Sequence, residues 1–290
     1  MKQKLPFAKY AAVCAAMVFT FCATTARAQD PRDLMPAASE AKARQLLAQT
    51  VDAMGGQVYL NARDLDCKGR YGQFDTSNGQ SEGSIEARFV RVYPNRSRTE
   101  LDSKTFITDI YGIPVNTHGR VVMAYSDDGA WSAGKDGVTD LGPDALSDFK
   151  AQLKTDMNTF LRTRLDEPGL LLRYGGNDLV DLKEVDWVEI SDSEHHDMRM
   201  AIDKSSHLPV RFSILSRDKV TNLRVDTART FTSYHLIGGM EVPFQSAVLV
   251  NDKITTQIFY SSCQANEGLP DSLFTRAGLE AEFKSGKKQK

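Results

Sequence analysis

The sequence predicts an α+β domain built on one large antiparallel sheet, with helices covering one of its faces. Most of the chain after residue 60 consists of short runs with apolar and polar alternation, separated by turn residues, which is typical of antiparallel strands. Two stretches instead repeat apolar residues every three or four positions, as helices packed on a sheet do. No repeat, long linker or abrupt change in composition divides the chain, which favours a single domain.

Residues 1–28 have the three parts of a secretory signal peptide. Three lysines in the first nine residues precede an apolar run from Tyr10 to Ala23, and Ala26-Arg27-Ala28 forms a small-x-small cleavage site. The apolar run is short for a bilayer span, which favours a cleaved signal over a membrane anchor. We therefore expect export, cleavage before Gln29 and a flexible leader over 29–36.

Removing the signal changes the charge and the cysteine count. The full 290-residue chain carries 36 Lys and Arg against 38 Asp and Glu, a net charge of −2. The mature chain carries 32 against 38, or −6 over 262 residues. This balance gives no general attraction for nucleic acid or anionic membranes. Cys67 and Cys263 remain in an exported protein, where they form one disulfide or stay as two buried thiols.

The first helical pattern runs from about Ala37 to Met54. Ser39 precedes Glu40 as an N-cap candidate, and Gly55-Gly56 ends the helix. The apolar positions of this helix share one face: Ala43, Leu47, Val51 and Met54.

Strand-like runs follow from Leu60. The alternation is clearest where Ile85, Ala87 and Phe89 take turns with polar neighbours. Further runs are expected over 106–111 and 121–125, and turn clusters such as Asp75–Gly79 separate them, as in an antiparallel meander.

A second helical pattern begins at Pro143-Asp144, continues to about Leu165 and ends at Asp166–Gly169. One apolar stripe follows its length: Leu146, Phe149, Leu153, Met157, Phe160 and Leu161. Such a stripe is either an ordinary core face or the inner face of a lid over an apolar cavity. Methionine and phenylalanine adapt well to irregular, lipid-like ligands.

Strands resume after this helix. They are expected over 185–190, 198–202, 210–214, 223–236, 242–250 and 253–262, with hairpin turns at Gly238-Gly239 and Asn251-Asp252. The polar residues 279–290 are expected to form a frayed tail.

Motifs for catalysis or metal binding are incomplete. Gly129 to Lys135 has the glycine and lysine spacing of a phosphate-binding loop, but Asp136 stands where Ser or Thr must hold magnesium. His195 and His196 are adjacent, so on a strand they would point to opposite faces. The sequence therefore predicts no enzyme activity, no metal and no cofactor.

One basic cluster contains Arg88, Arg91, Arg96 and Arg98. Arg96 and Arg98 are candidates for contacts with an anionic head group, and solvated strand positions are the simpler interpretation.

Several local motifs occur in the order found in a known family. They are Tyr93-Pro94-Asn95, Tyr125 to Trp131, Asp166 to Gly169, Ile202 to Pro209, Met240 to Phe244 and Pro270 to Phe274. In this order the chain resembles the periplasmic lipoprotein carriers of the LolA/LolB type, and more closely their outer membrane lipoprotein-sorting relatives. The motifs span most of the mature chain.

The resemblance implies an unclosed antiparallel β-barrel over 37–278, with the N-terminal and inserted helices on its concave face. It implies a monomeric, periplasmic, non-catalytic carrier whose hydrophobic cavity takes lipid or lipoprotein acyl chains. The cavity would be lined by Tyr93 and the apolar stripe of the inserted helix. The carriers place an arginine just before the Pro-Asn pair, where this chain has Tyr93.

Two questions stay open at the level of sequence. In an open meander the first and last strands can lie at opposite edges, so a Cys67–Cys263 bond would require those edges to approach. The alternative function is a cell-envelope interaction or sensor module, which would dock a protein partner and have no ligand cavity.

Overall fold

The computed structural model describes residues 34–103, 119–218 and 221–286. The predicted signal peptide, residues 29–33 of the leader, the strand expected over 106–111 and residues 287–290 lie outside this described part. None of the described helices is long and apolar enough to cross a membrane.

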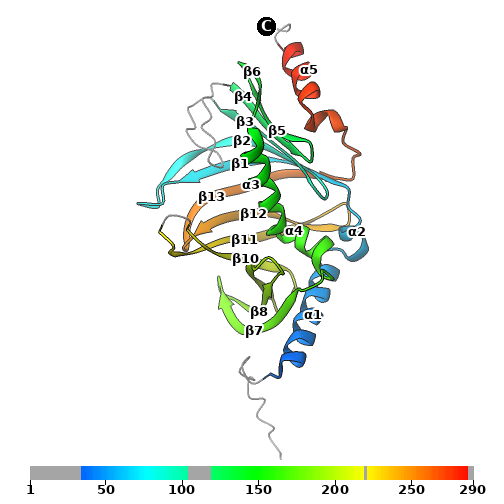
Figure 1. Ribbon diagram of the computed structural model, residues 1–290, viewed down its shortest axis with the longest axis vertical. Coiled ribbons are helices and arrows are strands. Elements are labelled where there is room, and N and C mark those ends of the chain that lie inside the picture. The colour runs from blue at the N-terminus through cyan, green and yellow to red at the C-terminus, as the bar shows by residue number, and fades with distance from the viewer. Residues whose placement is uncertain (1–33, 104–118, 219–220, 287–290) are drawn as a thin grey trace, which may run out of the picture.

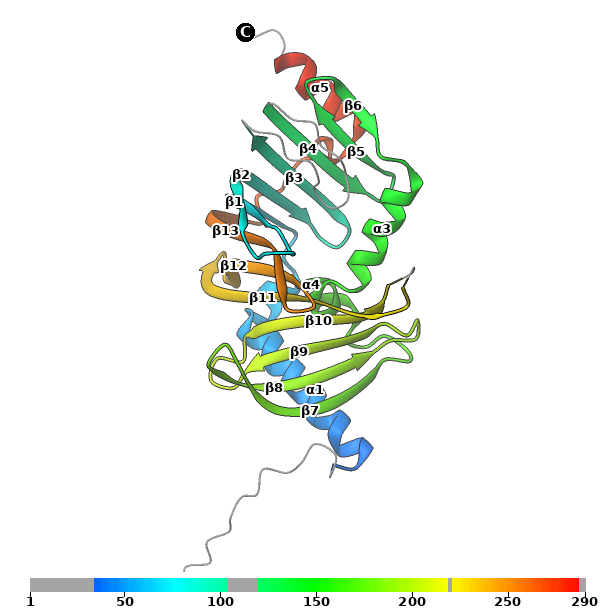
Figure 2. The same cartoon turned by 90° about the vertical axis from the view of Figure 1, so that its left-hand side faces the viewer.

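In the described residues, thirteen strands form one antiparallel sheet in the order β6-β5-β4-β3-β2-β1-β13-β12-β11-β10-β9-β8-β7 (Figures 1 and 2). The strands are β1 (Asp64–Phe74), β2 (Ser81–Val92), β3 (Arg96–Ser103), β4 (Gly119–Ser126), β5 (Gly129–Gly134), β6 (Gly137–Asp140), β7 (Leu171–Val180), β8 (Lys183–Ser191), β9 (Asp197–Asp203), β10 (Pro209–Arg217), β11 (Arg224–Ile237), β12 (Met240–Val250) and β13 (Lys253–Ala265). Because β6 and β7 are edges that do not pair, the barrel is unclosed and the predicted α+β class is confirmed.

The helical segments are α1 (Pro36–Ala53), α2 (Gly56–Leu60), α3 (Gly142–Lys154), α4 (Met157–Thr159), the π-helical η2 (Phe160–Arg164), the short 3₁₀ turn η3 (Asp271–Phe274) and α5 (Arg276–Gly286). Figure 2 shows α3 crossing the concave side of the sheet, between the β2–β6 end and the β7–β10 end. α1 lies on the same side, over β7 and β8.

The main hydrophobic core lies between α1, the α4–η2 segment and β7–β12. Leu46 and Leu47 of α1 and Phe160 of η2 are buried there, against side chains such as Phe212. Burying side chains of this size stabilises the fold by about 1.5–3 kcal/mol each. This half of the concave face is therefore closed.

Ser39 lies inside α1 and is not the N-cap, because the helix begins at Pro36 with Met35 in the capping position. Its hydroxyl instead accepts a hydrogen bond from the backbone nitrogen of Tyr174 in the edge strand β7, at 2.9 Å. α1 therefore covers part of the sheet edge as well as its face.

The single inserted helix expected to about Leu165 is wrong, because the segment breaks after α3. Thr155 and Asp156 separate α3 from α4, and Asp156 has extended backbone angles. Its carboxylate accepts the backbone hydrogen of Thr159 at 3.0 Å and so caps the next turn. An aspartate in this capping role favours a new helix start over continuation.

The frayed tail expected from Leu279 is also wrong in its described part. Residues 276–286 form α5, and Leu279 is fully buried on the convex face of the sheet. It packs with Val122 and Trp131, and Phe283 packs half-buried beside it. A short apolar stripe among polar residues is enough to dock a surface helix.

The first and last strands are neighbours in the middle of the sheet, which answers the question that the sequence left open. We call the β1–β13 pairing the seam. Cys67 and Cys263 face each other across it, with Cα atoms 4.1 Å apart, and form a disulfide. The bond closes a sequence separation of 196 residues. In the chain-entropy model a loop of that order contributes about 5 kcal/mol.

Gly69 allows the two seam strands to approach. The pairing register shifts at Lys68/Gly69, and a β-carbon on Gly69 would lie 1.9 Å from the carbonyl oxygen of Phe259. Gly72, three residues further along β1, has its nearest neighbour at 3.6 Å from a built β-carbon and can accept a methyl group.

We predict that Gly69→Ala lowers the free energy of unfolding by about 1–3 kcal/mol, because the added methyl forces the seam apart. Gly72→Ala is the matched control on the same strand, and we expect a change below about 1 kcal/mol. Urea unfolding with the disulfide intact measures both. Equal effects of the two substitutions would show that the seam tolerates wider spacing.

Candidate functional site

A second apolar surface lies on the concave face, over β2, β4, β12 and β13, on the side of the sheet that α3 crosses (Figure 1). Four half-buried aromatic residues, which we call the aromatic row, share this surface: Phe89, Tyr125, Phe244 and Tyr260. The ring centroids of Phe89 and Tyr260 are 5.7 Å apart, and those of Phe244 and Tyr260 are 6.2 Å apart. Unlike the main core, this surface is only partly closed.

The strand pairing brings the row together from four separate strands. Phe89 lies opposite Cys67, and Tyr260 lies opposite Gly69 across the seam. Beneath the rings, Tyr71 and Met123 belong to a buried cluster on the same face. The row therefore rests on the seam, and sequence reasoning missed it because its members are 171 residues apart along the chain, from Phe89 to Tyr260.

The predicted stripe of the inserted helix divides between two environments. Phe149 of α3 stacks on Tyr125 of the row with ring centroids 4.8 Å apart, and Leu146 and Leu153 are half-buried. Three other stripe residues belong to the main core: Met157, Phe160 and Leu161, the last two with at most 1% of their surface exposed. Side chains with no exposed surface do not border a space that holds even a water molecule.

Tyr93 lies in a different place from the α3 residues. Arg162 of η2 inserts between the rings of Tyr59 and Tyr93, with its guanidinium carbon 4.0 and 3.9 Å from their centroids. Its nitrogens donate to the carbonyl oxygen of Ala62 and approach the sulfur of Met240. We call Tyr59, Arg162 and Tyr93 the tyrosine–arginine stack.

The stack is an electrostatic contact between a cation and two neutral rings. Burial raises the pKa of Tyr59 and of Tyr93, and the Arg162 charge only partly opposes that rise. A desolvated cation–π contact contributes about 2 kcal/mol. Arg91 adds an ion pair to Asp156 at 3.3 Å. Together these contacts fix α4–η2 to α2, to the residues just before β1 and to the end of β2 with its following turn.

Arg96 and Arg98 are not placed to meet a ligand on the concave face. Arg98 is fully buried on the convex side, where it bonds Glu100 at 2.9 Å and Glu282 of α5 at 3.0 Å. Arg96 pairs with Asp271 at the start of η3. Thr99 pairs with Phe89 across β2 and β3, so these two side chains share the concave face. Because side chains alternate along β3, Arg98 lies on the other face. Both arginines hold the C-terminal segment.

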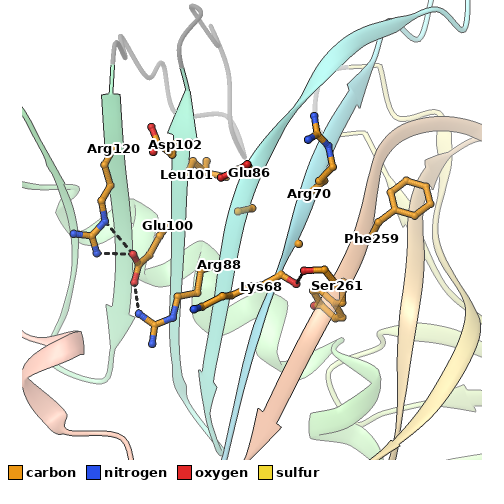
Figure 3. Close-up of a pocket in the computed structure, with 13 residues that line it drawn as sticks. Lys68, Arg70, Glu86, Arg88, Glu100, Leu101, Asp102, Arg120, Phe259 and Ser261 are labelled. Atoms are coloured by element: carbon orange, nitrogen blue, oxygen red, sulfur yellow. Dashed lines mark hydrogen bonds and ion pairs between the residues drawn. The ribbon is translucent and has the colours of Figure 1, made fainter.

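A groove of about 660 Å³ opens on the convex face across β13, β1, β2, β3 and β4 (Figure 3). Charged side chains dominate its lining. Arg88 and Arg120 both bond Glu100, and Arg88 also bonds Asp66. Burial alone would raise the pKa of Glu100, but the surrounding arginines outweigh it and hold the pKa below its usual value. An open, charged groove does not suit an acyl chain.

Among the described residues there is no group of three or more His, Cys, Asp or Glu side chains placed to hold a metal ion. His196 is instead within hydrogen-bond distance of Asp192, between its Nδ1 and the carboxylate at 2.8 Å, and His195 is exposed. The convergent groups of the concave face are aromatic and aliphatic, so the chemistry that they offer is apolar contact.

We predict that Arg162→Lys lowers the free energy of unfolding by about 1–2 kcal/mol, because a lysine keeps the charge but loses the planar stack and the forked donors. Arg173→Lys on the exposed side of β7 is the control, with an expected change within about 0.5 kcal/mol. Chemical unfolding of both variants, monitored by tryptophan fluorescence, gives the comparison. A loss no larger than the control's would mean that the stack contributes only packing.

No protein-family model and no curated protein matches this chain. Solved structures do match. A DUF1329 family protein from Desulfovibrio piger is 13% identical with a TM-score of 0.53, covering 83% of this chain and 99% of that chain.

A putative outer membrane lipoprotein-sorting protein domain from Vibrio parahaemolyticus is 10% identical with a TM-score of 0.47, covering 83% of this chain and 99% of that one. The LolA superfamily protein NE2245 from Nitrosomonas europaea is 13% identical with a TM-score of 0.45, covering 80% and 97%. At these identities the likeness is one of fold. The Desulfovibrio piger structure, with its TM-score above 0.5, shares the fold of this chain.

Proposed function

We propose that this chain is a periplasmic, non-catalytic binding protein that holds lipid or lipoprotein acyl chains on its concave face, between α3 and the aromatic row. The observation that carries the proposal is the division of the inserted segment. α4–η2 is buried in the main core, whereas α3 rests on the half-buried row through Phe149. A ligand can take the place of α3 on the sheet while the main core stays closed.

The free energy lost when α3 leaves the sheet is similar in size to that gained when an acyl chain is buried there. Exposing a fully buried side chain costs about 1.5–3 kcal/mol, and each buried methylene of a ligand gains about 0.8 kcal/mol. If Phe149, Leu146 and Leu153 all leave the sheet together, the lost burial is therefore offset by fewer than about ten buried methylenes of the ligand. An acyl chain of ordinary length would bind, and binding would be reversible, as a carrier requires.

The compartment is supported by two separate features. Residues 1–28 have the composition of a signal peptide. The Cys67–Cys263 bond is of a kind that persists in oxidising spaces such as the periplasm.

Phe244 and Phe259 provide a matched test, since they lie on neighbouring strands and on opposite faces. Phe244 belongs to the row, and Phe259 is 41% exposed on the convex face. We predict that Phe244→Asp weakens binding of a fluorescent fatty acid at least tenfold, because a carboxylate in the row must be desolvated. Phe259→Asp is expected to bind as the wild type does.

Fluorescence titration of the purified mature chain measures both affinities, and native mass spectrometry after mild purification shows whether lipid co-purifies. Absence of probe binding and of bound lipid in the wild type would end the proposal. Equal weakening by both aspartates would place the ligand elsewhere.

The second candidate is a cell-envelope interaction or sensor module that docks a protein partner. The closed main core and three exposed leucines at the β7 side of the sheet favour it: Leu171, Leu179 and Leu182. For this candidate we expect co-purification of a fixed envelope protein that persists in the Phe244→Asp variant.

A further inference from the structure

The loop between β8 and β9 holds a buried carboxylate that faces the inserted segment. Only 1% of the Asp192 side chain is exposed. It accepts backbone hydrogens from Glu194 at 3.0 Å and His196 at 2.9 Å. Burial alone would raise its pKa, but the hydrogen bonds from Arg164 and His196 outweigh burial and hold the pKa well below the usual carboxyl range. The group is therefore a fixed anion.

Arg164, the last residue of η2, connects this anion to two helical segments. Its Nη2 donates to Asp192 at 2.7 Å, and its Nε donates to Glu167 at 2.6 Å. Its Nη1 donates to the carbonyl oxygen of Lys154, the last residue of α3. One guanidinium thus joins the end of α3, the end of η2 and the β8–β9 loop.

A second, weaker connection lies beside the first. The Lys154 ammonium pairs with Glu194 of the same loop at 2.5 Å, and both side chains are about half exposed. Exposed pairs of this kind contribute little, with a median near 0–1 kcal/mol. Of these two charged connections, the Arg164 guanidinium is therefore the stronger at this end of α3.

The other end of α3 is held differently. The helix starts at Gly142, whose φ of +83° follows the edge strand β6, and no heavy atom lies within 4 Å of a β-carbon built there. Within α3 the buried side chain is Phe149, and the first-turn residues Pro143 and Asp144 are exposed. Among the described residues this end is held by the Gly142 N–H, which donates to the Asp140 carboxylate at 2.7 Å, and by packing on β5, with no charge network like that of Arg164.

We propose that Arg164 and Asp192 are positioning residues that form a fixed pivot for α3, so that α3 leaves the aromatic row from its Gly142 end. The functional consequence rests on the proposed function: an acyl chain would enter between α3 and the sheet from the β5–β6 side. The pivot itself is a property of the chain without ligand.

Hydrogen–deuterium exchange of the mature chain tests the pivot without any ligand. We expect amides of residues 146–149, which have acceptors within the helix, to exchange at least tenfold faster than those of 151–164. Arg164→Lys keeps the charge but cannot make the three divergent bonds, so we expect exchange over 151–164 to rise about tenfold or more. Asp192→Asn removes the anion at nearly constant volume and is expected to act in the same direction.

Glu194→Gln is the matched control, because it removes only the exposed Lys154 pair. We expect its exchange profile to match that of the wild type. Uniform exchange along 146–164 in the wild type would overturn the proposal, even if a variant failed to fold. So would wild-type protection of 151–164 in both Arg164→Lys and Asp192→Asn.

A stopped-flow measurement with the fluorescent fatty acid connects the pivot to binding. We expect Arg164→Lys to change the association and dissociation rates severalfold in the same direction, because α3 loses its fixed end, whereas Glu194→Gln leaves both rates unchanged. If the wild type binds no fatty acid while the exchange gradient is present, the proposed function fails and the pivot stands. Unchanged rates in Arg164→Lys would overturn the link between the pivot and the ligand.

Discussion

The pairing of β1 with β13 is the constraint on which the rest of the molecule depends. Each half of the sheet is a run of sequential antiparallel neighbours, and within the described strands this seam is the pairing that joins the halves. The disulfide and the close approach at Gly69 fix the seam, and the seam in turn sets the spacing of Phe89, Tyr260 and Phe244. The apolar surface under α3 therefore exists because the first and last strands of the sheet pair in its middle.

The two halves of the concave face are filled in different ways. Over β7–β12, α1 and α4–η2 form a closed core, while over the seam α3 covers a surface that stays partly open. The charged side chains follow this division. Arg162 and Arg164 hold the buried part of the inserted segment, and Arg98 holds α5 on the opposite face. These three arginines thus fasten helical segments to the sheet.

Local periodicity predicted most of the architecture, and it did not predict contacts between distant strands. Alternation and turn residues indicated the strands around 85–92, 121–125 and 242–262, and β7 was missed because its Gly175-Gly176 and its irregular register interrupt the alternation. The break at Asp156 was hidden because the apolar spacing continues on either side of it. The aromatic row, the seam and the Arg164 bonds depend on tertiary pairing, which no local pattern contains.

The hydroxyl of Ser39 has a consequence for the solubility of the protein. An edge strand of ten residues such as β7 offers unpaired amide groups to any other chain, and edges of this length are sites of aggregation. By crossing β7 and bonding the Tyr174 nitrogen, α1 blocks strand addition near the middle of that edge. A chain shortened by proteolysis within α1 would lose this protection, so the N-terminal helix acts as a guard against self-association as much as a part of the core.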